Sequence, residues 1–185
     1  IGGYTQVRYD RLVASPGAPA NEEADPALAS PARFSLRRVR VKLEADPHRF
    51  LHVYLQPERA GAAGESEHVA ELRDAYGDIS IDRDKELRLR VGLSKIPYGF
   101  ENMQSSQDRA PFDRSDALNS SFPNERGLGV FTMFAPKAVR ERFARLADAR
   151  HKGSGDFGMV TLGVFDGQGA LIEERDGLDA NIRLA

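Results

Sequence analysis

The sequence lacks several features that would quickly place it in a class of proteins. It contains no cysteine, which excludes disulfide frameworks and thiolate metal sites but is compatible with an oxidising compartment as well as with a cytoplasm. Its 26 basic and 28 acidic residues nearly cancel, so no net field would attract nucleic acid. The motif G-x-S-x-G, a P-loop and a cysteine nucleophile are all missing, so nothing in the sequence argues for an enzyme.

Long hydrophobic runs are also missing. No stretch approaches the roughly 18 to 20 consecutive apolar residues of a membrane helix, which excludes helical spans only, because membrane-crossing strands hide their apolar face in alternation. The chain does not begin with methionine and shows no signal-peptide pattern, so we expect a mature form or an excerpt. Its 185 residues are enough for one ordinary domain with a real core, and we predict a single domain over 1–185.

Two apparent ligand-binding motifs do not fit their structural context. The glycines of 153–158 satisfy G-x-G-x-x-G, but they follow a helical pattern and enter a strand, the reverse of a dinucleotide fingerprint. The acidic residues of 82–86 resemble the start of a calcium loop, yet Leu87 stands where that loop needs glycine. The 4 histidines form no cluster, so we expect neither a metal nor a cofactor.

Alternation of apolar and charged residues is the clearest pattern that is present. In 87–93, leucine and valine occupy one face, while Arg88 and Arg90 occupy the other. Because charge needs water, these arginines point either to bulk solvent or into a water-filled interior. Similar alternation predicts strands at 3–9, 38–45, 49–56 and 74–81.

The second predicted strand carries an irregularity. Phe34 and Leu36 fall on its charged side, so we predict either a β-bulge near Arg37 or a capped strand end there. Residues 46–48 form a short connection to the third strand, which favours an antiparallel hairpin.

The C-terminal part of the chain gives less regular signals. Strands are predicted at 127–135 and 157–165, but both are apolar on two faces, so their orientation cannot be read from periodicity. The last five residues resemble the start of a strand. Between the predicted strands 127–135 and 157–165, residues 137–150 have the spacing of a short amphipathic helix, which packs either on the surface of its own domain or on a membrane or partner.

Two all-β folds accommodate these strands. One is a soluble β-sandwich or meander with one solvated charged face, acting as a binding module. The other is an antiparallel transmembrane β-barrel, whose outer face is apolar and whose lumen is polar. A sandwich rarely holds a connection as long as the polar stretch 97–126, and a connection of this length usually carries function.

Five segments in register resemble one known family. RFSLRRVRVKLEA, ELRDAYGDI, LRLRVGLSKIPYGFENMQSS, NERGLGVFTMF and FGMVTLGVFDGQG are similar, in this order, to the N-terminal half of the phosphate-selective porin O and P family. The resemblance spans Arg33 to Gly169, and its most specific part runs from Val91 to Ser106.

The resemblance implies an outer-membrane porin of a Gram-negative bacterium, a large antiparallel barrel that usually forms a homotrimer and lets small anions such as phosphate diffuse through water. The seven or eight strands expected here are about half of such a barrel. After the fifth strand the family has an inward-folding loop that narrows the pore, here 97–126. Pro97 would end strand pairing and Gly99 would let the chain bend inward. The helix at 137–150 would be an insert in a periplasmic connection, which is normally short.

An anion pore presents arginine and lysine side chains from its wall and its narrowing. The alternative for each arginine is a solvated position or a pair with a nearby acid, and the loop carries more acidic than basic residues. The charge of the loop therefore leaves the sign of the selectivity open, and a structural or assembly barrel without real transport is a further alternative. The expected wall residues are Arg38, Arg40, Lys42, Arg88 and Arg90, and the expected loop residues are Lys95, Arg109, Arg114 and Arg126.

Overall fold

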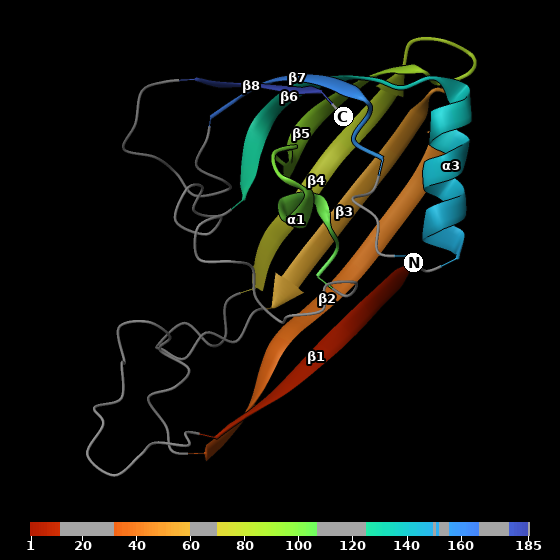
Figure 1. Ribbon diagram of the computed structural model, residues 1–185. Coiled ribbons are helices and arrows are strands. Elements are labelled where there is room, and N and C mark those ends of the chain that lie inside the picture. The colour runs from red at the N-terminus through yellow and green to blue at the C-terminus, as the bar shows by residue number, and fades with distance from the viewer. Residues whose placement is uncertain are drawn as a thin grey trace. The chain divides into compact units, whose positions relative to one another are not determined.

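The computed structural model describes residues 1–11, 32–59, 70–106, 125–149, 151, 156–166 and 178–184. Within these residues, eight strands form one sheet in chain order (Figure 1). They are β1 (Gly2–Arg11), β2 (Ala32–His48), β3 (Leu51–Arg59), β4 (Ala70–Ser80), β5 (Leu87–Lys95), β6 (Arg126–Phe134), β7 (Val160–Phe165) and β8 (Asp179–Leu184). The pairs β1–β2 and β4–β5 through β7–β8 are antiparallel.

The predicted all-β antiparallel class is therefore confirmed. The strand order is linear, with β1 at one edge and β8 at the other, so closure into a barrel stays a prediction. The described residues also hold two helices, α1 (Phe100–Met103) and α3 (Lys137–Asp148), and neither is long and apolar enough to cross a membrane. Residues 1–43 with 56–72 form one compact unit and residues 44–55 with 73–185 form a second, and each is described by itself.

The first unit contains the predicted irregularity. Gln6 pairs with Arg38 but Val7 pairs with Leu36, so Arg37 is an extra residue in β2, and the predicted bulge is confirmed. A bulge reverses the alternation of the strand. Phe34 and Leu36 consequently join the exposed apolar face instead of the charged one.

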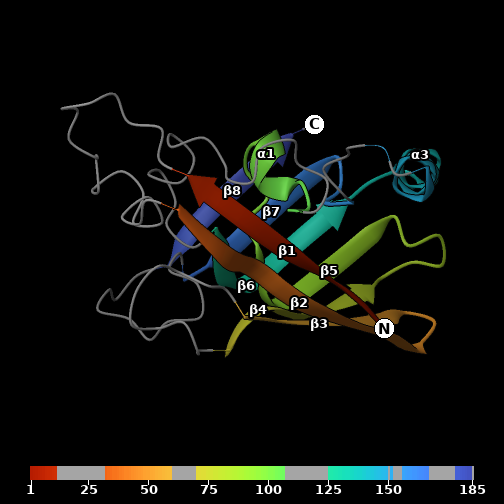
Figure 2. The same cartoon turned by 90° about the horizontal axis from the view of Figure 1, so that it is seen from below.

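The second unit exposes apolar side chains in continuous cross-strand rows. Val91 of β5 pairs with Val130 of β6, which pairs with Val164 of β7, and all three are more than 40% exposed. Figure 2 shows β5 to β8 side by side, and Val164 pairs in turn with Ala180 of β8. Fully burying each such side chain is worth roughly 1.5–3 kcal/mol, and a monomeric soluble protein rarely leaves a patch of this kind in water.

The opposite face of the same strands holds the polar residues. Arg88 and Arg90 of β5 and Asp78 of β4 are less than 10% exposed, because they pack against one another and against neighbouring side chains. In β6 and β7, whose orientation the sequence left open, Leu128 and Leu162 are exposed, whereas Phe131, Met133 and Phe165 on the opposite face are buried. The sheet therefore shields its charged face and exposes its apolar face.

Several strand ends differ from the sequence prediction. β2 continues to His48, and the turn lies at residues 49–50 rather than 46–48. Asp46 looks like a turn residue, but its carboxylate lies 3.0 Å from Nδ1 of His52 and pairs the strands at this point. β7 begins at Val160 instead of Phe157, because Gly158 has φ +78°, a conformation incompatible with a continuous strand.

Connections alternate in length along the chain. The connections β2–β3 and β4–β5 are short, whereas the connections β1–β2, β3–β4, β5–β6 and β7–β8 are longer. In an antiparallel sheet this places the short connections at one end of the strands, here called the turn end. The helix α3 belongs to the connection β6–β7 at the turn end.

Candidate pore wall

Arg90 is fixed in the second unit by a carboxylate pair and by contacts with aromatic rings. It pairs directly with Asp78 across β4 and β5, with Nε 2.7 Å from Oδ1 and an amino nitrogen 2.8 Å from Oδ2. Its guanidinium also stacks 3.8 Å from the ring centre of Tyr76 and lies 5.5 Å from that of Phe157. A two-point carboxylate pair and a stacked ring fix the plane of the guanidinium.

Arg126 is held in the same way at the start of β6. Its Nε and an amino nitrogen lie 3.1 and 3.0 Å from the two carboxylate oxygens of Asp74 in β4. Its other amino nitrogen is 3.0 Å from Glu125. Since β5 lies between β4 and β6, this side chain reaches past an entire strand to its partner. One arginine thereby links two non-adjacent strands of the wall.

Arg88 connects the wall to the turn end. An amino nitrogen lies 2.7 Å from Oδ1 of Asp156, whose Oδ2 accepts a hydrogen bond of 3.0 Å from Nε of Arg140 in α3. One carboxylate is thus shared between a strand arginine and a helix arginine. The Asp156 carboxylate therefore links α3 to the charged face of the sheet.

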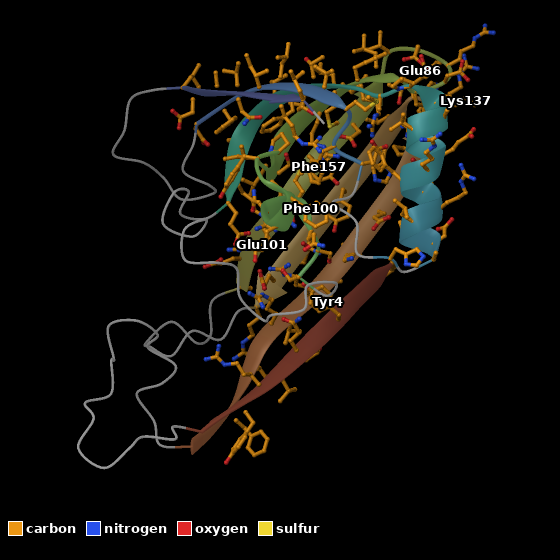
Figure 3. All side chains as sticks on the ribbon, viewed as in Figure 1. Tyr4, Glu86, Phe100, Glu101, Lys137 and Phe157 are labelled. Atoms are coloured by element: carbon orange, nitrogen blue, oxygen red, sulfur yellow. The ribbon has the colours of Figure 1, made fainter. Side chains whose placement is uncertain are left out.

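The turn between β4 and β5 and the start of α3 form a polar cluster. The pKa of Asp82 is lowered because its carboxylate accepts hydrogen bonds from the backbone N–H groups of Leu87 and Glu86. The pKa of Lys137 is raised, chiefly by its hydrogen bond to Asp84. Figure 3 shows Glu86 beside Lys137, whose backbone N–H donates to the Glu86 carboxylate at 2.8 Å.

The first unit repeats the pairing of arginine with acid. An amino nitrogen of Arg40 lies 2.7 Å from Glu58, and the other donates to the Tyr4 hydroxyl at 2.9 Å. Arg38 donates to the side-chain oxygen of Gln6 at 2.9 Å and lies 3.9 Å from Glu58. The Lys42 ammonium lies 5.9 Å from the Tyr4 ring centre.

The structure describes all of the expected residues except Arg109 and Arg114. The arginines of the expected wall and Arg126 lie beside acidic side chains, as one of the alternatives stated. Lys95 donates to the backbone carbonyl groups of Met103 and Gln104. Pro97 is buried directly after β5, and Gly99 has φ +57° immediately before α1. Arg109 and Arg114 lie outside the described residues.

Chemically, the described part of this face is a row of paired charges. A guanidinium has five N–H donors, and the two-point pair with Asp78 occupies two of those of Arg90. No group of three or more histidine, aspartate or glutamate side chains arranged to hold a metal occurs among the described residues. The described part of this face therefore carries charges of both signs.

Sequence reasoning missed two of the acidic partners. Glu58 lies beyond the predicted end of the third strand, yet it continues the parity of His52 and Gln56, so extending that strand by two residues would have found it. Asp156 lies in a connection without periodicity, and no local signal places it beside Arg88. Contacts of this second kind depend on how α3 and β7 return to the sheet.

An apolar outer face and a polar, charged inner face are typical of antiparallel sheets that span membranes as channels. Comparison with known protein families agrees. A family model described as phosphate-selective porin O and P matches residues 23–180. The chain belongs to this family, as its resemblance predicted. No curated protein and no solved structure matches the chain.

Proposed function

We propose that the chain forms part of the wall of an outer-membrane porin, a water-filled channel through which small anions such as phosphate diffuse passively. The observation that carries this proposal is the reversed sheet: buried arginine and aspartate on one face and exposed valine, leucine and phenylalanine on the other. Membership of a family of channels supports it. The proposed location is the outer membrane of a Gram-negative bacterium, and the proposed assembly is a homotrimer.

The proposed role of the apolar face is contact with lipid. Val91 and Val130 lie at the middle of β5 and β6, where a membrane strand faces hydrocarbon, and Val164 of β7 continues their row. The soluble β-sandwich has less support, because the described strands form one sheet rather than two facing sheets. Extraction separates the two: the porin requires detergent, whereas recovery from the aqueous fraction without detergent would contradict it.

The proposed role of the polar face is to guide ions. Arg40 and Arg90 are the best test positions, because each has a described carboxylate partner and lies on the buried side of its strand. Replacing an arginine by glutamate changes the local charge by two units beside an existing acid. Anions should then be repelled from that part of the wall.

The test is a reversal potential measured across a planar bilayer under a salt gradient. We expect an anion-leaning value for the unaltered protein and a smaller anion preference for Arg40→Glu and for Arg90→Glu. Arg83→Glu is the matched control, because Arg83 is exposed in the β4–β5 turn and salt screens it. A cation-leaning value for the unaltered protein would contradict phosphate transport, and unchanged values in both variants would remove these arginines from the ion path.

A further inference from the structure

A small apolar surface interrupts the polar face of the second unit. The rings of Phe131 in β6 and Phe165 in β7 stack with their centres 5.5 Å apart, and both side chains are fully buried. Glycines make room for them: a Cβ on Gly127 would lie 2.7 Å from Cδ2 of Phe165, and a Cβ on Gly163 would collide with Phe131. The two rings therefore lie flat on glycine backbone, in a place where a larger residue would lift them off.

The residue that follows β5 packs onto these rings. Ile96 is 1% exposed and forms one apolar cluster with Phe131 and Phe165, and Tyr98 packs against this cluster. The chain then turns at Gly99 and enters α1, which Figure 1 shows alongside the strands rather than beyond their ends. Residues 96–98, here called the root of the long β5–β6 connection, therefore pack on the same face of the sheet as the buried arginines.

Two polar side chains fasten the next residues to this root. Asn102, which is 0% exposed, donates from its side-chain amide to the carbonyl oxygen of Ile96 at 2.8 Å. The Lys95 ammonium donates to the carbonyl oxygens of Gln104 at 2.6 Å and Met103 at 3.3 Å. Carbonyl groups that end a short helix otherwise need water, so an ammonium among them stabilises the turn by charge-assisted hydrogen bonds.

We propose that Lys95 and Asn102 are positioning residues that hold residues 100–106 against the wall and so determine where the channel narrows. In this role the Lys95 ammonium binds backbone oxygen atoms instead of passing anions. The inference rests on the proposed porin function for its consequence, but the fastening itself is a property of the folded chain. Its tests can therefore be separated from the test of transport.

The first experiment measures the fastening without any transport. Because the chain has no cysteine, Ser106→Cys introduces a unique thiol at a residue that is 3% exposed, and its reaction with a water-soluble thiol reagent reports on opening of the segment. We expect Lys95→Met to accelerate this reaction about tenfold or more, the factor given by losing one hydrogen bond to a charged group. Asn102→Ala should act in the same direction, and Lys95→Arg should largely restore the slow reaction.

Lys137→Met is the matched control, since it removes the same charge from an exposed helix residue that does not touch the segment. An equal rate in Lys95→Met and in this control would overturn the proposal. If Lys95→Met does not fold, Asn102→Ala carries the test alone, and an unaccelerated reaction in that variant has the same meaning.

The second experiment measures the consequence in planar bilayers. If the segment is fastened by these two residues, Lys95→Met and Asn102→Ala should both increase open-channel current noise and admit larger neutral polyethylene glycols. Asn102 carries no charge, so agreement between the two variants excludes a simple loss of anion attraction. A lower anion preference in Lys95→Met, with an unchanged polymer limit, would make Lys95 an ion ligand and overturn the proposal.

The two failures are distinguishable. A protein that forms no channel but shows accelerated thiol reaction refutes the porin function and leaves the fastening intact. A protein that forms channels with unaltered noise and unaltered thiol reaction in both variants refutes the fastening alone.

Discussion

Asp78 offers the sharpest perturbation of the wall, because it neutralises Arg90 through two hydrogen bonds of 2.7 and 2.8 Å. Asp78→Asn keeps the shape of the side chain and removes its negative charge. The Arg90 guanidinium stays anchored by its stack 3.8 Å from the Tyr76 ring centre, so we expect the variant to retain the strand pairing. The change therefore uncovers a positive charge in place.

The magnitude follows from Coulomb's law. An anion bound at the free edge of the Arg90 guanidinium would lie about 6 Å from the Asp78 carboxylate, and their repulsion is about 0.7 kcal/mol in bulk water and about 3 kcal/mol at an effective dielectric constant of 20. Removing the carboxylate removes this repulsion. Even at the lower repulsion of about 0.7 kcal/mol, the local anion concentration rises about threefold. A channel interior lies between these limits, so threefold is the smallest effect we expect.

The assay is the anion-to-cation permeability ratio, obtained from the reversal potential in a planar bilayer at low ionic strength. Asp78→Asn should raise this ratio about threefold or more, and higher salt should reduce the difference by screening. Asp46→Asn is the control, because it removes one carboxylate charge from a side chain that is 67% exposed in the β2–β3 hairpin. An unchanged ratio, or a shift toward cations, would show that ions do not pass Arg90.

Two further predictions concern stability. Gly127→Ala should destabilise the fold by about 1–3 kcal/mol, because its Cβ would meet the ring of Phe165. Gly77→Ala is the control and should be nearly neutral, because no atom lies closer than 3.7 Å to a Cβ at that position. Thermal unfolding followed by electrophoretic mobility compares the two variants, and equal midpoints would contradict the packing. Asp82 has a lowered pKa in the folded state, so its contribution is present above the unfolded value of about 3.9 and is lost as the pH falls through the folded-state value. Asp82→Asn should consequently flatten the acid limb of the stability curve, and a parallel limb would argue against the hydrogen bond to Leu87 as its cause.

Strand positions could be predicted from the sequence because a membrane-type sheet alternates with a period of two residues. The pattern of 87–93 gave both the strand and its two faces, and the misplaced parity of Phe34 and Leu36 gave the bulge at Arg37. Strand ends were less predictable. Asp46 is a turn residue by local preference, but β2 continues past it to His48, and its carboxylate contacts His52 across the hairpin.

The candidate wall was predictable by residue type but not by pairing. Arg90 and Asp78 face each other directly across two strands, and strand register could have suggested their contact. Arg126 and Asp74 are separated by an intervening strand, and Asp156 reaches Arg88 from a connection, so neither contact has a signature in local periodicity. The helix α1 was not predicted, because four residues are too few to show a helical period.

Under the proposed function, the glycine and phenylalanine pattern of β6 and β7 lets the solute preference of the channel change without moving the place where the channel narrows. The first residue of the β5–β6 connection, Ile96, packs on Phe131 and Phe165, which belong to β6 and β7 and not to the connection itself. The rest of the connection can then change in length or charge without displacing its root. Under the proposed function, the site of the narrowing is inherited with the strands, and the preference of the narrowing for one solute over another is free to diverge.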